Sequence, residues 1–151
     1  MTSNRVGDAI LSTGLLDHLL EQYPAATATV ACGPSAVSLF RPCNRVDKIV
    51  ALQKMRYAGH WVRLWTQSVG TFWNIVVDLR ASALSWVLPH AQHFIFKSTN
   101  EPVHRVVSLG KVLGLSEPPA PRVWLDEADA VRARQLVPDG PVLALGPTAN
   151  W

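Results

Sequence analysis

A Gly-Asp pair near the amino terminus is the first candidate for chemistry in this sequence. Asp8 follows Gly7, and the apolar residues after it recur at the spacing of one helical face. A carboxylate in this position is either a cap of the helix or a general base that takes a proton from a hydroxyl group. Glycine at position 7 would let a ligand approach the backbone closely. The sequence leaves both interpretations of Asp8 open.

Basic side chains follow the short apolar runs that we expect to form strands. Ligands of an open parallel sheet bind beyond the carboxyl ends of its strands, so these cations should line one edge of a cleft. Such an edge suits an anionic ligand, for example a phosphate or a sugar acid. The alternative is that each cation is an ordinary solvated loop residue. The cations are Arg5, Lys54, Arg56, Arg80 and Lys97.

Asp78 precedes Arg80 by two positions at the end of a strand-like run. The two side chains would either pair with each other or point into the cleft. We therefore include both as candidate ligand contacts.

Several familiar kinds of site are not indicated. The sequence has no Gly-x-Ser-x-Gly elbow, no Walker-type loop and no full Gly-x-Gly-x-x-Gly motif. The histidines lack metal-ligand spacing, and Cys32 and Cys43 fit neither a disulfide framework nor a zinc motif. We predict no metal and no cofactor. Two cysteines in this pattern fit a reduced cytoplasmic setting.

Composition limits the class of protein. The chain has 151 residues, of which 48% are hydrophobic, and a formal net charge of +3. This is enough apolar material for one core, so a disordered chain is excluded. The mild positive charge does not indicate nucleic acid. No apolar run reaches the roughly 18 residues of a membrane-spanning helix. Residues 41–63 hold six cations against one acid, which predicts a solvated basic face or one resting on an anionic membrane.

Strand-like runs alternate with segments of helical periodicity along the chain. This alternation predicts an α/β protein with a Rossmann-like parallel sheet and helices on both faces. Residues 117–121 are rich in proline and read as a linker. The expected helices cover 8–23, 35–40, 55–69, 81–88, 101–115 and 127–136, and the expected strands cover 27–32, 46–52, 74–79, 93–96 and 141–145.

The two ends fit a complete domain poorly. A doubly wound domain normally starts with a central strand, but few residues precede the first expected helix. A strand should also lead into a loop and a helix, whereas little sequence follows 141–145. We therefore expect a segment of a longer protein. Residues 1–138 would be a domain whose first strand is largely missing, and 139–151 the first strand and loop of a second domain.

The ordered set of motifs resembles glycosyltransferase family 9, the heptosyltransferases of lipopolysaccharide core synthesis. Residues 4–13 (Asn-Arg-Val-Gly-Asp-Ala-Ile-Leu-Ser-Thr) resemble its opening Gly-Asp motif, and residues 77–80 (Val-Asp-Leu-Arg) its Asp-Leu-Arg segment. His104-Arg105-Val106 and the later Leu113-Gly114-Leu115 resemble its next helix. Residues 145–151 resemble the start of its donor-domain phosphate loop.

This resemblance implies the amino-terminal, acceptor-binding half of a GT-B fold. Asp8 would deprotonate an acceptor hydroxyl, which would attack the anomeric carbon of ADP-heptose in an inverting displacement without a metal. The acidic glycolipid acceptor would contact Arg5, Gly7, Asp78, Arg80 and Lys97, and the donor phosphates would contact Thr148 and Asn150. The protein would be cytoplasmic, in peripheral contact with the inner membrane, and would have no nucleic-acid partner.

Without the donor half, we expect this chain alone to have no transferase activity. Two alternatives remain at this point. One is a different GT-B enzyme that uses a nucleotide sugar, and the other is a non-catalytic Rossmann-like fragment.

Overall fold

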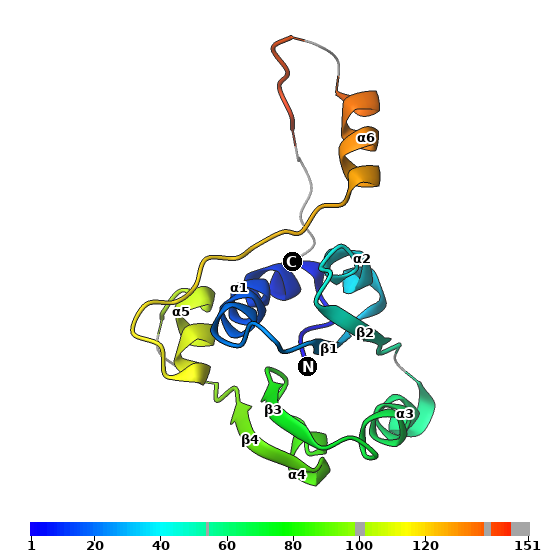
Figure 1. Ribbon diagram of the computed structural model, residues 1–151, viewed down its shortest axis with the longest axis vertical. Coiled ribbons are helices and arrows are strands. Elements are labelled where there is room, and N and C mark those ends of the chain that lie inside the picture. The colour runs from blue at the N-terminus through cyan, green and yellow to red at the C-terminus, as the bar shows by residue number, and fades with distance from the viewer. Residues whose placement is uncertain (54, 99–101, 138–139, 146–151) are drawn as a thin grey trace.

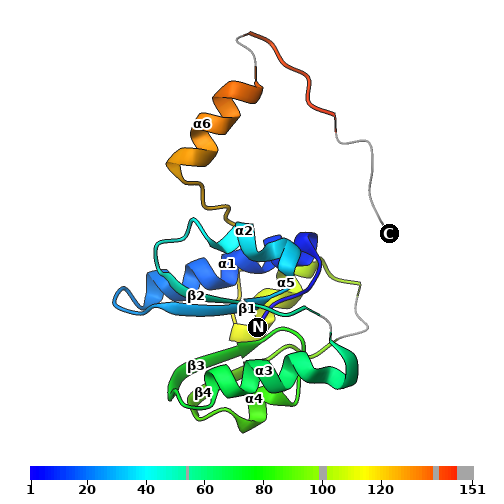
Figure 2. The same cartoon turned by 90° about the vertical axis from the view of Figure 1, so that its right-hand side faces the viewer.

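The computed structural model describes residues 1–53, 55–98, 102–137 and 140–145. Its body places parallel strands between helices, as Figures 1 and 2 show from two sides. The helices of this body are α1 (Val6–Gln22), α2 (Val37–Phe40), α3 (Gly59–Ser68), α4 (Leu84–Val87) and α5 (Arg105–Gly110), with the short 3-10 turns η1 (Pro34–Ala36), η2 (Arg56–Ala58) and η3 (Lys111–Leu113). The strands are β1 (Ala28–Cys32), β2 (Val46–Ala51), β3 (Trp73–Asp78) and β4 (His90–Ile95), and α6 (Glu127–Leu136) follows.

The strands form two parallel pairs and not the single continuous sheet that we expected. β1 pairs with β2, and β3 pairs with β4, in two separate two-stranded sheets. Residues 1–3 run between the pairs, because the backbone N–H of Thr2 donates to Ala31 O at 2.9 Å and that of Leu79 donates to Met1 O at 3.0 Å. In Figure 2 the amino terminus lies between β1 and β3. The chain start therefore connects the two halves of the body.

Helices cover both faces of the strands, as predicted. On one face, Val30 and Cys32 of β1 pack in a buried cluster with Ala9 of α1 and Phe40 of α2. On the other face, the neighbouring Ala31 belongs to a cluster with residues of α3 and α4. Successive side chains of a strand point to opposite faces, so one strand serves both clusters. The predicted α/β class is confirmed.

The segment after η3, predicted to be a linker, packs against α1. A Cβ added to Gly14 would lie 2.6 Å from the carbonyl oxygens of both Pro119 and Ala120, so only glycine fits this approach. The backbone N–H of Arg122 donates to the hydroxyl of Thr13 at 2.9 Å. The segment is therefore a fixed part of the fold and carries the chain along α1.

Several ends of elements differ from the prediction. The helices α3, α4 and α5 are shorter than the predicted 55–69, 81–88 and 101–115. The first helix begins at Val6 and not at Asp8, since Arg5 is its N-cap. The fourth strand begins at His90, directly after Pro89, and not at His93. Its polar residues hid the strand, because a strand at the edge of a sheet tolerates polar side chains.

The expected strand at 141–145 is absent from the structure. These residues have no regular secondary structure, and the side chains of Leu143 and Leu145 are 82% and 78% exposed. Together with α6 they project from the body in Figure 1. An apolar run needs a neighbouring strand to pair with, and none lies beside this one among the described residues. The division at residues 138 and 139 stays a prediction.

Candidate functional site at the carboxyl ends of the strands

The turn that follows β3 is held by the carboxylate of Asp78. Its Oδ1 accepts from the backbone N–H of Arg80 at 2.9 Å, and its Oδ2 accepts from the N–H and hydroxyl of Ser82 at 2.6 and 2.8 Å. Asp78 is fully buried, and Ala81 adopts the left-handed conformation, with φ at 51°. Buried carboxylates need such partners. The observed function of Asp78 is therefore to fix this turn, and its predicted contact with a ligand stays a prediction.

The side chain of Arg80 turns away from Asp78. The ion pair between them, one of the two predicted alternatives, does not form. Its Nη1 donates to Oδ1 of Asn4 at 3.0 Å. Its guanidinium carbon lies 4.9 Å from the centre of the Trp61 ring, a cation–π contact. Neither partner is anionic, and no salt bridge to Arg80 occurs among the described residues. The guanidinium is thus positioned with its charge available to an anion.

Asp8 lies in the first turn of α1, at the same edge. Its Oδ2 accepts from the hydroxyl of Ser3 at 3.2 Å. The helix begins two residues earlier, with Arg5 as its N-cap and no side-chain cap hydrogen bond. Asp8 is therefore not the helix cap that one interpretation expected. Its function as a general base stays a prediction, supported by a partly buried carboxylate with one weak hydroxyl partner.

The loop after β1 contacts the loop that carries Asn4. A Cβ on Gly33 would lie 2.6 Å from Cα of Asn4, and the hydroxyl of Ser35 donates to Asn4 O at 3.3 Å. These contacts fix Asn4, and Asn4 in turn orients Arg80. The sequence predicted neither Asn4 nor Trp61 as a residue of the site. Their only signals were the position of Asn4 beside Arg5 and the general rule that strand-end loops carry ligands.

The remaining predicted contacts are exposed at or near this edge. Arg5 is exposed, and so is Gly7, where an added Cβ would meet no atom within 4 Å. Lys97 is exposed directly after Phe96, whose N–H donates to Asp78 O at 2.8 Å. Lys97 therefore lies at the strand end that also carries the Arg80 turn. Lys54, Thr148 and Asn150 lie outside the described residues, as does the side chain of Arg56.

The predicted basic face of residues 41–63 is only partly a face of unpaired charges. Arg45 donates to the backbone carbonyls of Leu20, Tyr23 and Ala26 and so closes the end of α1. Lys48 donates to the carbonyl of Gln67 at 3.3 Å. Helix ends have unpaired carbonyl groups that arginine can satisfy, which explains this structural use of a cation. Arg45 is therefore withdrawn from the basic face.

The described ranges contain no cluster of three metal-ligating side chains and no helix long and apolar enough to cross a membrane. Neither finding bears on residues outside those ranges.

Comparison with known proteins gives an informative similarity to a solved structure. No protein-family model and no curated protein matches the chain. A solved structure does: the crystal structure of the glycosyl transferase family 9 from Veillonella parvula DSM 2008, with a TM-score of 0.67 and 16% sequence identity. The match covers 87% of this chain and 45% of that one, so the present chain spans less than half of that protein. At this identity the match establishes that the chain has an α/β fold shared with part of a glycosyl transferase structure.

Proposed function

We propose that this chain is the acceptor-binding part of a family 9 glycosyltransferase. The enzyme would transfer heptose, or a related sugar, from a nucleotide-sugar donor such as ADP-heptose to an acidic lipopolysaccharide core acceptor. One observation carries the proposal: Arg80 is oriented by Asn4 and Trp61, without an anionic partner, at the strand edge that also holds Asp8. The shared fold supports it.

Arg80 would bind a phosphate or carboxylate of the acceptor. Its planar guanidinium presents several donors, and two of its contacts already fix its position. The Arg80 side chain then loses less conformational entropy when the ligand binds, which favours affinity. Arg5 and Lys97, both exposed, would add charge around the same acidic group.

Asp8 would act as the general base. Its carboxylate takes the proton of the acceptor hydroxyl as that oxygen bonds to the anomeric carbon of the donor. The bond from that carbon to the nucleotide diphosphate breaks on the opposite face, so the configuration inverts. Ser3 would keep the carboxylate oriented through its hydrogen bond. Thr148 and Asn150, in the proposed donor segment 139–151, would bind the donor phosphates.

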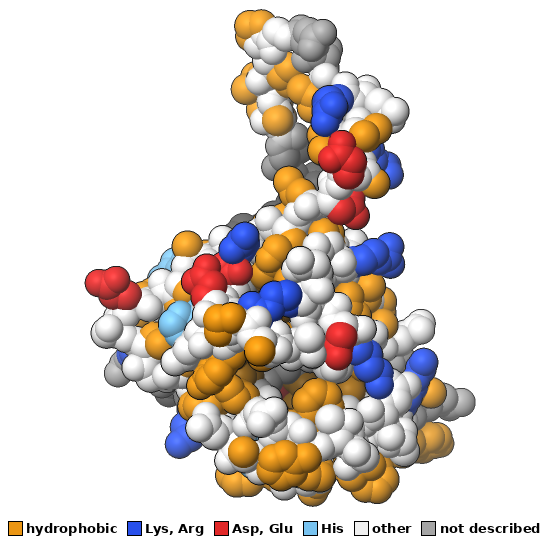
Figure 3. Space-filling view, in the orientation of Figure 1, with side chains coloured by type: hydrophobic (Ala, Val, Ile, Leu, Met, Phe, Trp, Pro, Cys, Tyr) orange, Lys and Arg blue, Asp and Glu red, His pale blue; other side chains and the backbone are white. Residues whose placement is uncertain are grey.

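Contact with the inner membrane surface would use the face that carries α3 and α4. Exposed apolar side chains there include Val62, Trp65, Trp86 and Val87, and Figure 3 shows hydrophobic side chains gathered on the lower part of the molecule. Aromatic side chains favour the interface between lipid and water. Arg63, exposed on α3, would supply attraction to anionic lipid.

Calorimetric titration of this chain tests the proposal. A core oligosaccharide with carboxylate groups should bind, and its affinity should fall with added salt. A neutral oligosaccharide of equal size is the control and should bind at least about 10-fold more weakly, since a charge-assisted contact contributes roughly 1.5 kcal/mol or more. Equal binding of the two would contradict the proposal. Consumption of ADP-heptose by this chain alone would contradict its assignment to the acceptor part.

A further inference from the structure

Two histidine rings of β4 contact each other beside an exposed tryptophan. The ring centres of His90 and His93 are 4.6 Å apart, and the ring of Trp86 in α4 meets that of His93 edge to face, with centres 4.7 Å apart. His90 begins β4 and pairs with Trp73, which begins β3. Arg80 follows the other end of β3. The histidine pair is therefore separate from the proposed acceptor site and independent of the proposed function.

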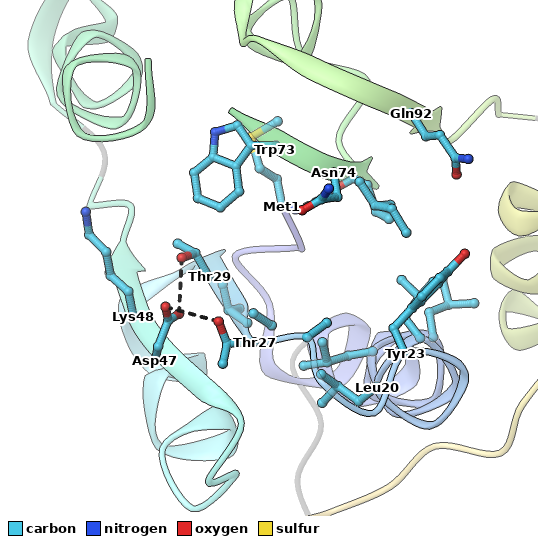
Figure 4. A pocket seen from close by; sticks show the side chains of 18 of the residues that line it. Met1, Leu20, Tyr23, Thr27, Thr29, Asp47, Lys48, Trp73, Asn74 and Gln92 are labelled. Carbon is cyan, nitrogen blue, oxygen red and sulfur yellow. Dashed lines mark hydrogen bonds between the residues drawn. The ribbon is translucent and has the colours of Figure 1, made fainter. Parts of the chain in front are cut away.

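The pair is also separate from the large cavity of the body, which has a volume of about 1030 Å³. From β4 that cavity is lined by Ala91 and Gln92. Figure 4 shows Gln92 there, with Trp73 and Asn74 of β3. The two histidine rings instead contact each other and the exposed helix α4.

A hydrogen bond fixes which nitrogen of His90 carries a proton. Its Nδ1 lies 2.7 Å from the backbone oxygen of Leu88, and a carbonyl oxygen can only accept. Nδ1 therefore carries the hydrogen, and the lone pair of the neutral ring is on Nε2. Histidines that bind a metal commonly donate their other N–H to a backbone carbonyl in this way.

The second ring offers a nitrogen that the polypeptide does not satisfy. Nε2 of His93 is buried and has no hydrogen-bond partner among the described residues. Such an atom is unfavourable unless an ordered water or an ion meets it. Imidazole nitrogen is a good ligand for divalent transition metals. His93 therefore presents a buried ligand atom next to a histidine whose tautomer suits metal binding.

The spacing of the rings fits two neighbouring ligands of one ion. For a metal–nitrogen bond of about 2.0 Å, with each ring centre about 1.2 Å behind its nitrogen, ligands at about 90° have ring centres about 4.5 Å apart. At the tetrahedral angle that Zn²⁺ prefers, the centres would be about 5.2 Å apart. The observed 4.6 Å is closer to the right-angled arrangement. Tetragonal sites of this kind suit Cu²⁺ and Ni²⁺.

We propose that His90 and His93 bind one Cu²⁺ or Ni²⁺ ion through their Nε2 atoms, with water in its remaining positions. The proposal departs from the sequence prediction of no metal. Side chains three apart on a strand normally point to opposite faces, so the spacing of the two histidines does not indicate a site. The contact between their rings does, and it arises where the chain enters β4 after Pro89.

Titration of the intact chain with CuCl₂, followed by tryptophan fluorescence, tests the proposal. Cu²⁺ quenches a nearby tryptophan, and Trp86 contacts His93, so we expect saturable quenching at one ion per chain. His90→Gln and His93→Gln should each weaken binding at least about 10-fold, since even residues that only orient a metal ligand contribute about 10- to 100-fold. The matched control is His18→Gln, which removes a histidine of α1 and should leave the affinity unchanged.

Two measurements do not depend on how well the histidine variants fold. Pulsed electron paramagnetic resonance of the unsubstituted chain with one equivalent of Cu²⁺ should detect two coordinated imidazoles. Trp86→Phe should lose most of the quenching and keep the same resonance signal, because Trp86 reports the ion without binding it. Zn²⁺ should displace Cu²⁺ only at about 10-fold excess or more.

Other results would overturn the proposal. Quenching that does not saturate, or that is equally strong in His90→Gln and His93→Gln, would place the ion elsewhere and assign the buried nitrogen of His93 to a water. A resonance signal from one imidazole would show that the rings do not share an ion. Displacement of Cu²⁺ by an equal concentration of Zn²⁺ would contradict the right-angled geometry.

Discussion

Arg80 donates a hydrogen bond to the side-chain oxygen of Asn4 at 3.0 Å, across 76 positions of the chain. This contact joins the loop at the chain start to the loop after β3, on the edge where the strands end. Asp78 fixes the turn from one side and Trp61 packs against the guanidinium from the other. The cation is therefore held in place before any ligand arrives, which is the arrangement that several of the following predictions test.

Replacing Arg80 should weaken binding of an acidic oligosaccharide. Arg80→Met keeps much of the apolar stem but removes the charge and the planar donors, and we expect the dissociation constant to rise about 10- to 100-fold. Arg63→Met, an exposed position on α3, removes the same charge and is the matched control. Calorimetry at fixed salt measures both. An equal loss of affinity in the two variants would show that binding depends only on the net charge of the chain.

Replacing Asp8 should lower turnover with little effect on acceptor affinity. In a protein that joins this chain to a donor domain, Asp8→Asn should reduce kcat by roughly 10²- to 10⁴-fold, the contribution of a general base. Ser3→Ala should cause a smaller loss, because Ser3 only orients the carboxylate. The control is Asp47→Asn, since Asp47 is exposed and accepts from the hydroxyls of Thr27 and Thr29. An Asp8→Asn variant with unchanged kcat would exclude Asp8 as the base.

The sequence predicted the alternation of elements because the spacing of apolar residues within each helix or strand reflects which of its sides is buried. This spacing can be read from a short stretch of sequence. It predicted β1, β2 and β3 within one residue at either end. It could not show that the strands divide into two pairs, because pairing depends on whether a neighbour occupies the space between β1 and β3. The prediction of a strand at 141–145 was wrong for the same reason. Its apolar residues suit a strand, but no strand lies beside them among the described residues.

The hydrogen-bond partners of polar side chains were the second feature that the sequence could not predict. Asp78 and Arg80 stand two apart, and the sequence offered an ion pair between them. The carboxylate instead accepts from backbone N–H groups, a local bond that competes with any ion pair. Arg45 was counted with the basic face, yet it caps the end of α1. Such uses depend on which carbonyl groups the fold leaves unpaired, and a residue's type does not reveal that.

Two glycines of α1 should respond to alanine in opposite directions. Gly14→Ala places a Cβ 2.6 Å from two backbone oxygens of the packed segment, and should lower the free energy of unfolding by roughly 1–3 kcal/mol. Gly7→Ala meets no atom and should raise it by about 0.5–1 kcal/mol, because alanine favours the helix. Urea denaturation measures both. A Gly14→Ala variant as stable as the parent would show that the segment does not pack tightly on α1.

Both cysteines should be inert in the folded chain. Cys32 is completely buried and Cys43 nearly so, and burial raises the pKa of the Cys32 thiol to about 11. Reaction needs the thiolate, so Cys32 should react at least about 100-fold more slowly at pH 8 than an exposed cysteine. A colorimetric thiol reagent should detect neither cysteine in the native chain and both after denaturation. Rapid reaction of Cys32 without unfolding would contradict this burial.

The amino group of Met1 should make stability depend on pH. Burial lowers its folded-state pKa below the ordinary 8.0, so the folded chain favours the neutral amine. This contribution is present above pH 8 and is lost as the pH falls through the folded-state pKa, because the unfolded chain then binds the proton more readily. An acetylated amino terminus cannot take up this proton, yet its N–H can still donate to Val77. The acetylated chain should therefore gain stability over the free chain as the pH is lowered from 9 to 6 in urea titrations. Parallel curves for the two forms would show that the amine is solvated and not enclosed between β1 and β3.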